Sequence, residues 1–188
     1  FKRRDEDAYD PICDHLLVLE RPAHQKMRRG WRRRPRVVGT YRVLRQEVAE
    51  ANDGFYTQGE YDIAPLIAAK SPDYRFVELG RSCVLKPYRN KRTIELLWHG
   101  LWTYVREHGI DVMIGCASFE GTDPKEHANA LSFLYHHALA PPEWRVKAHA
   151  NLYTKMDLIP KEKLDAKAAL KALPPLIKGY LRLGAFVG

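Results

Sequence analysis

Three segments of the chain have the apolar pattern of β-strands. Residues 14–20, "DHLLVLE", form a short apolar run that predicts a buried strand, and residues 36–47, "RVVGTYRVLRQE", predict a longer one. Residues 75–85, "RFVELGRSCVL", have the clearest strand pattern of the chain. We expect these three segments to belong to a central sheet.

A helix with one apolar face is predicted after the third strand, from near Thr93 to a stop at Gly109. Apolar residues recur along it at spacings of three and four, at Ile94, Leu97, Trp98, Leu101 and Val105. Residues 110–119, "IDVMIGCASF", are almost all apolar, which predicts a strand covered on both faces. Strand, helix and strand within about forty residues indicate a right-handed crossover unit.

Further helices are predicted over residues 63–69, 125–138 and 161–172, with a break at Pro141 and Pro142. The end of the sequence, "PPLIKGYLRLGAFVG", stays apolar up to Gly188, so we expect the sequence to stop inside the fold with at least one strand absent. The length and the apolar content predict one domain over residues 1–188, and the predicted strands and helices make it an α/β domain.

The charge of the chain points to an anionic partner. Lys and Arg number 31 against 23 Asp and Glu, which gives a net charge of +8. Nucleic acid, an anionic membrane or an acidic protein would each satisfy this balance. Six arginines lie within residues 28–36, a segment that we expect to be a solvated or anion-covered loop.

Several classes of protein are excluded by what the sequence does not contain. Three cysteines are too few and too scattered for a disulfide framework, which fits a reducing cytosol, and neither they nor the histidines have the spacing of a zinc site, so we expect no metal. No apolar run reaches the roughly 18 residues of a membrane span, and the first residues lack the apolar stretch of a signal peptide. We therefore expect a soluble or peripheral protein.

The segment "KPYRNKRTIELLWHG", residues 86–100, joins the end of a strand to the start of a helix. A helix N-terminus offers unpaired backbone N–H groups and a positive dipole end, and both suit a phosphate. Four cations, at Lys86, Arg89, Lys91 and Arg92, add charge around this point. The alternative is a solvated basic loop without a ligand.

Glu78 and Arg81 are charged residues within an apolar strand, where a charge costs free energy unless it is paired or used. Their spacing would point them to opposite faces of a regular strand. A bulge at Gly80 would bring both side chains to the same side. The pair is then either a buried ion pair, or a base and an anion clamp at a reaction centre.

Asp7, Asp10 and Asp14 are spaced by three and four residues and would share one face of a helix. They either bind an amine or cap that helix. Cys83 and Cys116 lie in the two central strands without a histidine spaced to activate them, so we interpret both as core residues. Trp98 and Trp102 also fit core positions, although Trp102 lies off the apolar stripe, where it could touch an acyl chain.

The strand, Pro87, Arg89 at the start of a helix, and the second apolar strand together resemble the pyrophosphate-binding segment of the GNAT acyltransferase superfamily. The resemblance implies a mixed central sheet flanked by helices, with a pantetheine arm between two splayed central strands. Arg92 and Ile94 stand where that family has glycines, which favours the single phosphodiester of a carrier-protein phosphopantetheine over coenzyme A. The segment expected to bind it contains Lys86, Tyr88, Arg89, Asn90, Lys91, Arg92 and Thr93.

A closer resemblance comes from motifs along the whole chain. "VELGR", "DEDAYD" and "RVVGTYR" are similar to the acyl-homoserine-lactone synthases. The ornithine lipid synthesis acyltransferases, often labelled hemolysin-like, are resembled by "YDPICDHLLVL", "GFYTQGEYD", "IDVMIGCASFEGTDP", "LAPPEWR" and "LPPLIKGYLRLGAFVG". In that bacterial family the α-amine of L-ornithine attacks a 3-hydroxyacyl thioester on acyl carrier protein.

The resemblance also assigns roles to residues. It implies that Glu78 and Arg81 are catalytic at the acceptor site, and that Asp7 and Asp10 bind the amine-bearing substrate. Cys83 and Trp102 are further candidates for substrate contacts. No resident cofactor is implied, because the donor is acyl carrier protein with its 4′-phosphopantetheine arm.

The sequence leaves two other hypotheses open. The acceptor could be a different amino acid or amine, which spacing does not exclude. A basic nucleic-acid-binding module would explain the charge, but the sequence has no recognised helix-turn-helix or stacking platform, and Glu78 would have no role. A lytic protein would need a long amphipathic segment that we do not find. We therefore expect a cytoplasmic enzyme, with contact to the anionic inner face of the membrane.

Overall fold

The computed structural model describes residues 5–21 and 35–188. Its contacts divide the chain into two compact units, one made of residues 1–57 and 71–116 and the other of residues 58–70 and 117–188. The predicted arginine loop falls outside the described residues, apart from Arg36. The single domain expected from the sequence stays a prediction.

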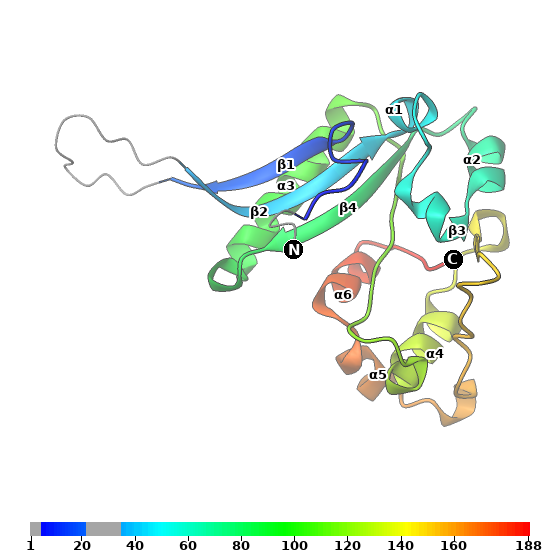
Figure 1. Cartoon of the computed structure of the whole chain (residues 1–188). Helices are drawn as coiled ribbons and strands as arrows, with labels where there is room; N and C mark the ends of the chain where they lie inside the picture. Colours follow the sequence, from blue (N-terminus) through cyan, green and yellow to red (C-terminus); the bar gives the residue numbers. More distant parts are fainter. Residues whose placement is uncertain (1–4, 22–34) are drawn as a thin grey trace, which may run out of the picture. The chain divides into compact units, whose positions relative to one another are not determined.

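The first unit is a four-stranded mixed sheet with helices (Figure 1). Its strands have the order β1-β2-β4-β5, with β1 and β2 antiparallel, β2 and β4 antiparallel, and β4 and β5 parallel. The elements of this unit are β1 (Asp14–Glu20), β2 (Arg36–Arg45), α1 (Gln46–Glu50), β4 (Phe76–Val84), α3 (Lys91–Glu107) and β5 (Val112–Ile114). The predicted α/β fold and the parallel crossover through a helix are confirmed.

One face of this sheet is apolar because alternate strand residues point toward α3. Tyr41 and Val43 of β2 and Val77 of β4 pack there against Leu97 and Leu101 of the helix. Asn90 caps the start of this helix, since its side-chain oxygen accepts a hydrogen bond from the Thr93 backbone N–H at 3.0 Å. The predicted helix is confirmed, and most of its predicted apolar residues face the sheet. Ile94 is the exception, since it is 41% exposed.

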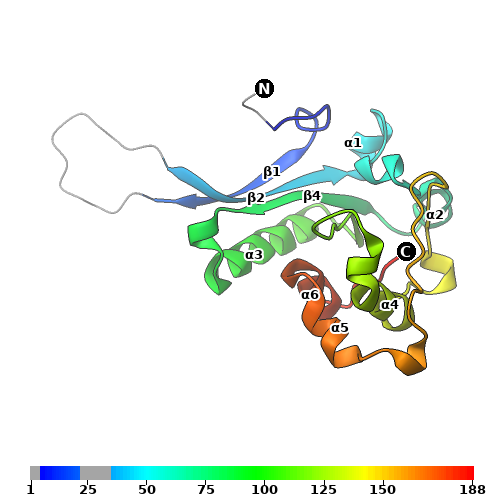
Figure 2. The same cartoon turned by 60° about the horizontal axis from the view of Figure 1, so that its bottom comes forward.

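Residues 5–13 follow the opposite face of the sheet as a series of turns. Figure 2 shows α3 below the strands and this segment, in dark blue, above them. The helix expected to carry Asp7, Asp10 and Asp14 on one face is therefore wrong, since Asp14 already begins β1. Strand β1 lies at the sheet edge and is not buried, because Leu17 and Leu19 are about half exposed.

The second unit is mainly helical. Its elements are β3 (Tyr61–Asp62), α2 (Ala64–Lys70), α4 (Ala128–His137), β6 (Lys147–Ala148), α5 (Ala166–Ala172) and α6 (Pro175–Arg182). The core contains Ala130 and Leu134 of α4 with Leu173 and Ile177 from the C-terminal part. The predicted helices at 63–69 and 125–138 are confirmed, whereas the one at 161–172 is confirmed only in its second half, and α6 was not predicted.

Candidate active site

Strands β4 and β5 pair for only three residues and then separate. Their paired positions end at Glu78 opposite Ile114, while β4 continues to Val84. Gly115 follows the last pair, and a Cβ atom there would lie 2.4 Å from the Leu79 carbonyl oxygen. Only glycine therefore fits at position 115, where the chain after β5 separates from β4. The apolar run 110–119 is not one long covered strand, because β5 covers only Val112–Ile114.

The predicted bulge in β4 is present, one residue after the expected position. Gly80 pairs with Arg42 and Cys83 with Thr40, so that Arg81 and Ser82 together face one residue of β2. Arg81 has a φ of 48°, a left-handed conformation that costs a non-glycine residue about 1–3 kcal/mol. The bulge re-aims the side chain of Arg81 and ends the regular alternation of β4.

Glu78 is buried in β4, with 5% of its surface exposed. Its Oε1 accepts hydrogen bonds from the Thr57 backbone N–H at 2.7 Å and from the Thr57 hydroxyl at 2.5 Å. Its Oε2 accepts one from the Tyr56 backbone N–H at 2.9 Å. A carboxylate has about four lone-pair positions, so one on Oε2 stays open. These bonds hold the Tyr56–Thr57 turn and keep the buried charge solvated by protein groups.

Arg42 of β2 is the second buried charge on this face, with 6% of its surface exposed. Its Nη1 donates to Asp7 Oδ1 at 2.6 Å and to Asp10 Oδ1 at 2.8 Å. The rings of Tyr9 and Tyr56 lie 5.6 and 5.8 Å from its guanidinium carbon. Arg42 was missed, although a charge within an apolar strand is the same signal that identified Glu78.

Arg81 pairs with the acidic N-terminal segment and not with Glu78. Its Nη1 donates to Asp5 at 2.7 Å and its Nη2 to Asp7 at 2.9 Å. Asp7 therefore bridges Arg42 and Arg81. The hypothesis of a Glu78–Arg81 ion pair is wrong, because each side chain binds other groups.

The two arginines set the ionisation of the acids. The Arg42 guanidinium beside Asp7, followed by that of Arg81, holds the pKa of this carboxyl well below its usual range. Arg42 also lowers the pKa of Asp10. Burial raises the pKa of Cys13 to about 11, so this thiol stays protonated at neutral pH. The cluster is thus a set of fixed charges of both signs.

A cavity of about 590 Å³ opens beside this cluster. Its lining includes carboxylates, guanidinium groups, an imidazole and a thiol, from Asp5, Glu6, Asp10, His15, Thr40, Arg42, Arg81, Ser82 and Cys83. The interpretation of Cys83 as a core residue is wrong, since its side chain is exposed in this lining. His15 and Thr40 were not predicted, because sheet register alone brings them here.

The remaining predicted site residues lie elsewhere in the first unit. Trp102 is 60% exposed on α3, which packs on the other face of the sheet from Arg42. Trp98 is half-buried beside Tyr41, as a core residue would be. Asp14 receives a hydrogen bond from the Tyr104 hydroxyl at 2.5 Å. Within residues 5–21 and 35–188, no group of His, Cys, Asp or Glu side chains is arranged to hold a metal ion.

The basic segment before α3 forms the 3₁₀ turn Lys86–Tyr88 and the start of the helix. Arg89 Nε donates to the Val84 carbonyl at 3.0 Å, and Lys91 pairs with Glu95 at 3.4 Å. Lys86 and Arg92 are exposed, whereas Thr93 is buried. The N–H groups of Lys91 and Arg92 begin the helix, where no preceding turn can accept from them. The predicted segment therefore keeps two backbone donors and four exposed cations, of which Arg89 and Lys91 already have partners.

No helix among the described residues is long and apolar enough to cross a bilayer. A profile described as an acetyltransferase (GNAT) domain matches residues 1–99. No solved structure matched the chain.

Curated relatives match the whole chain. It is 55% identical to an L-ornithine N(alpha)-acyltransferase of Agrobacterium fabrum and 54% identical to one of Rhizobium meliloti, over 100% of this chain and 61% of each relative. A protein of the same name from Rhodobacter capsulatus is 42% identical over 99% of this chain and 68% of its own length. The chain thus spans about three fifths of the first two relatives. It belongs to the GNAT acyltransferases, in the branch of the proteins named L-ornithine N(alpha)-acyltransferase.

Proposed function

We propose that the protein transfers a 3-hydroxyacyl group from acyl carrier protein to the α-amine of L-ornithine, which yields lyso-ornithine lipid. The observation that carries this proposal is the separation of β4 from β5 directly after Glu78. It leaves one edge of Leu79–Val84 without a β5 partner, next to a buried carboxylate. A thioester arm laid along this edge would present its carbonyl beside Glu78.

The acceptor is an amino acid in this proposal because the cavity contains charges of both signs. Arg81 would bind the carboxylate of ornithine, and the acids of the N-terminal segment would hold its side-chain ammonium. Both oxygens of Asp7 already pair with arginines, whereas Asp10 pairs with one arginine through Oδ1 and accepts the Asp7 backbone N–H at Oδ2. The names of the relatives support ornithine as the acceptor.

Glu78 is the proposed base. The open lone pair of Oε2 would accept the proton of the α-ammonium, directly or through a water molecule. The free amine then attacks the thioester carbon, the C–S bond breaks, and the pantetheine thiolate takes up a proton as the amide forms. Fixing amine and thioester in one geometry supplies much of the acceleration. No resident cofactor is needed, since the phosphopantetheine arm is part of the donor.

Acyl carrier protein is the proposed partner on the basic side of the unit. Its acidic surface would meet Lys86 and Arg92, and the phosphodiester of its arm would bind the N–H groups at the start of α3. Cys83 and Trp102 are retained as substrate contacts, Cys83 in the cavity and Trp102 near an acyl chain. We also propose a cytoplasmic location at the anionic inner face of the membrane, since the product is a lipid and the net charge is +8.

The test combines purified protein, 3-hydroxyacyl carrier protein and a panel of amino acids, with mass spectrometry of the lipid product. We expect lyso-ornithine lipid with ornithine and little product from other amines or from 3-hydroxyacyl-coenzyme A. A product with another amine would keep the chemistry and replace the acceptor. No acyl transfer to any amine, together with salt-dependent duplex binding, would contradict the proposal.

A further inference from the structure

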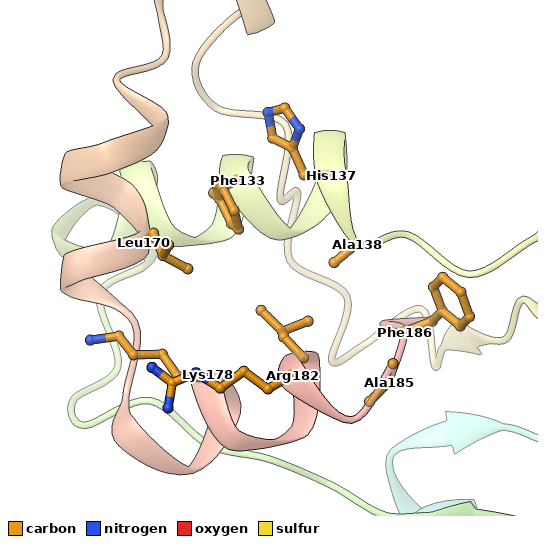
Figure 3. Close-up of a pocket in the computed structure, with 10 residues that line it drawn as sticks. Phe133, His137, Ala138, Leu170, Lys178, Arg182, Ala185 and Phe186 are labelled. Atoms are coloured by element: carbon orange, nitrogen blue, oxygen red, sulfur yellow. The ribbon is translucent and has the colours of Figure 1, made fainter.

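A second cavity, of about 380 Å³, lies within the helical unit. Its walls come from α4, α5, α6 and the residues that follow α6. Figure 3 shows Phe133 of α4 and Leu170 of α5 projecting into the same space. This volume is at the lower end of the range for small-molecule sites, about 300–1,000 Å³, and suits one hydrocarbon chain better than two.

The lining of this cavity is apolar except for cations. Lys178 and Arg182 are one helical turn apart on α6 and share one face of the helix, and both line the cavity in Figure 3. His137 is the only other ionisable group among the lining residues, and none of them is acidic. Two cations on one rim repel each other unless an anion joins them.

The acids of this unit do not supply that anion. Asp165 caps α5 by accepting from two backbone N–H groups, and Asp157 lies 3.2 Å from His136. Lys178 Nζ donates one bond, to the Lys171 carbonyl at 2.7 Å, and keeps two further donors. Within the described residues the guanidinium of Arg182 has no ion pair.

Apolar side chains at the mouth extend the cavity to the surface. Leu170 is 45% exposed and Phe186, beyond the end of α6, is 63% exposed. Large exposed apolar residues around a hollow mark a binding surface more often than isolated ones do. The apolar floor and cationic rim together match a molecule with a hydrocarbon chain and a negative head.

We propose that this cavity binds an anionic amphiphile with a single acyl chain. The anionic head group of this molecule pairs with Lys178 and Arg182. The chain lies against Phe133 and Leu170. The site is separate in sequence from the residues assigned to acyl transfer, so it is a second lipid-binding site of the protein and does not depend on the proposed reaction.

The test is isothermal titration of the full chain with monomeric dodecanoate, with dodecyltrimethylammonium as the probe of equal chain length and opposite charge. We expect dodecanoate to bind at least about tenfold more tightly. The double variant Lys178→Glu/Arg182→Glu should lose this preference. Lys161→Glu/Lys163→Glu makes the same charge change outside the cavity and should keep it. Ala185→Trp, which fills the cavity without changing its charge, should weaken both probes.

Sedimentation with phosphatidylglycerol or phosphatidylcholine vesicles identifies the source of the head group. Anionic vesicles that bind through Lys178 and Arg182 would place it in a bilayer, and dodecanoate binding alone would make it a free amphiphile. Equal binding of both charged probes, equal loss in the Lys161/Lys163 variant, or no binding of dodecanoate and anionic vesicles would overturn the proposal.

Discussion

The two faces of the sheet formed by β2 and β4 differ in what they contribute. On the face covered by α3, Tyr41, Val43 and Val77 belong to the hydrophobic core. One residue along each strand, Arg42 and Glu78 are also buried, and both make hydrogen bonds to polar groups on the other face. The alternation of a strand thus places the buried charges on the face away from α3, so substitutions on the two faces should have different consequences for activity.

Glu78→Gln, on the polar face, should have the largest effect on activity. The amide cannot take a proton from the amine, so kcat/KM for ornithine should fall by about 10²–10⁴-fold while the fold persists. Steady-state kinetics and thermal unfolding measure the two quantities.

Thr57→Val is the matched control for Glu78. It removes the hydroxyl that donates to Oε1 but leaves the carboxylate. We expect a loss of about 1–3 kcal/mol of stability and a small change in kcat. An equal loss of activity in Thr57→Val and Glu78→Gln would make Glu78 a support of the Tyr56–Thr57 turn and not a base.

Leu97→Ala, on the apolar face, should lower stability and leave catalysis unchanged, which is the reverse of the effect of Glu78→Gln. Leu97 is 2% exposed, and its truncation should lower the free energy of unfolding by about 2–5 kcal/mol. Well below the melting temperature, KM and kcat per folded molecule should stay unchanged. A large fall in kcat of the folded variant would show that the faces are not independent.

Arg42→Met should destabilise the protein by about 2–3 kcal/mol, below the 3–5 of a fully buried pair because its two acids are about a quarter exposed. Native Asp7 and Asp10 have lowered pKa values. Their stabilisation is complete above the ordinary carboxyl pKa of 3.8 and is lost as pH falls below it. Urea unfolding between pH 7 and 2 should therefore show a flatter acid limb for the variant.

The exposed ion pair of Lys91 with Glu95 provides the control. Lys91→Met should change stability by less than about 1 kcal/mol and leave the acid limb unchanged. An acid limb of Arg42→Met as steep as that of the unmodified protein would contradict the role of Arg42.

Asp10→Asn should have the smallest effect. It removes one negative charge from the cavity lining, so the KM for ornithine should rise about two- to fivefold with little change in kcat. Asp73→Asn, an exposed acid outside the lining, should leave KM unchanged. If both variants have the KM of the unmodified protein, Asp10 does not bind the substrate.

The same contrast explains what the sequence could predict. Apolar runs located β2 and β4, because consecutive residues of both strands are buried, and helical periodicity located α3, because it buries one face. A charge in an apolar strand identified Glu78 correctly as a buried group. Applied to residues 36–47, the same reasoning would have found Arg42.

Features that depend on contacts distant in the sequence were not predictable in this way. The spacing of Asp7, Asp10 and Asp14 suggested a helix, but pairing of Asp7 and Asp10 with Arg42 holds the segment in turns. The run 110–119 is apolar beyond β5, so composition could not show that pairing stops at Ile114. The partners of Arg81 are 74 and 76 positions away, and no local pattern reveals them.

In the proposed reaction, the donor arm lies along the edge of β4 that has separated from β5. This placement is tested most directly by the crystal structure of the protein with a 3-hydroxyacyl pantetheine amide, which cannot be cleaved as a thioester. We expect the arm beside Leu79–Val84, with its carbonyl next to Gly80 and within reach of an amine bound near Glu78. An arm bound elsewhere, or a further strand occupying that edge of β4 in its place, would contradict it.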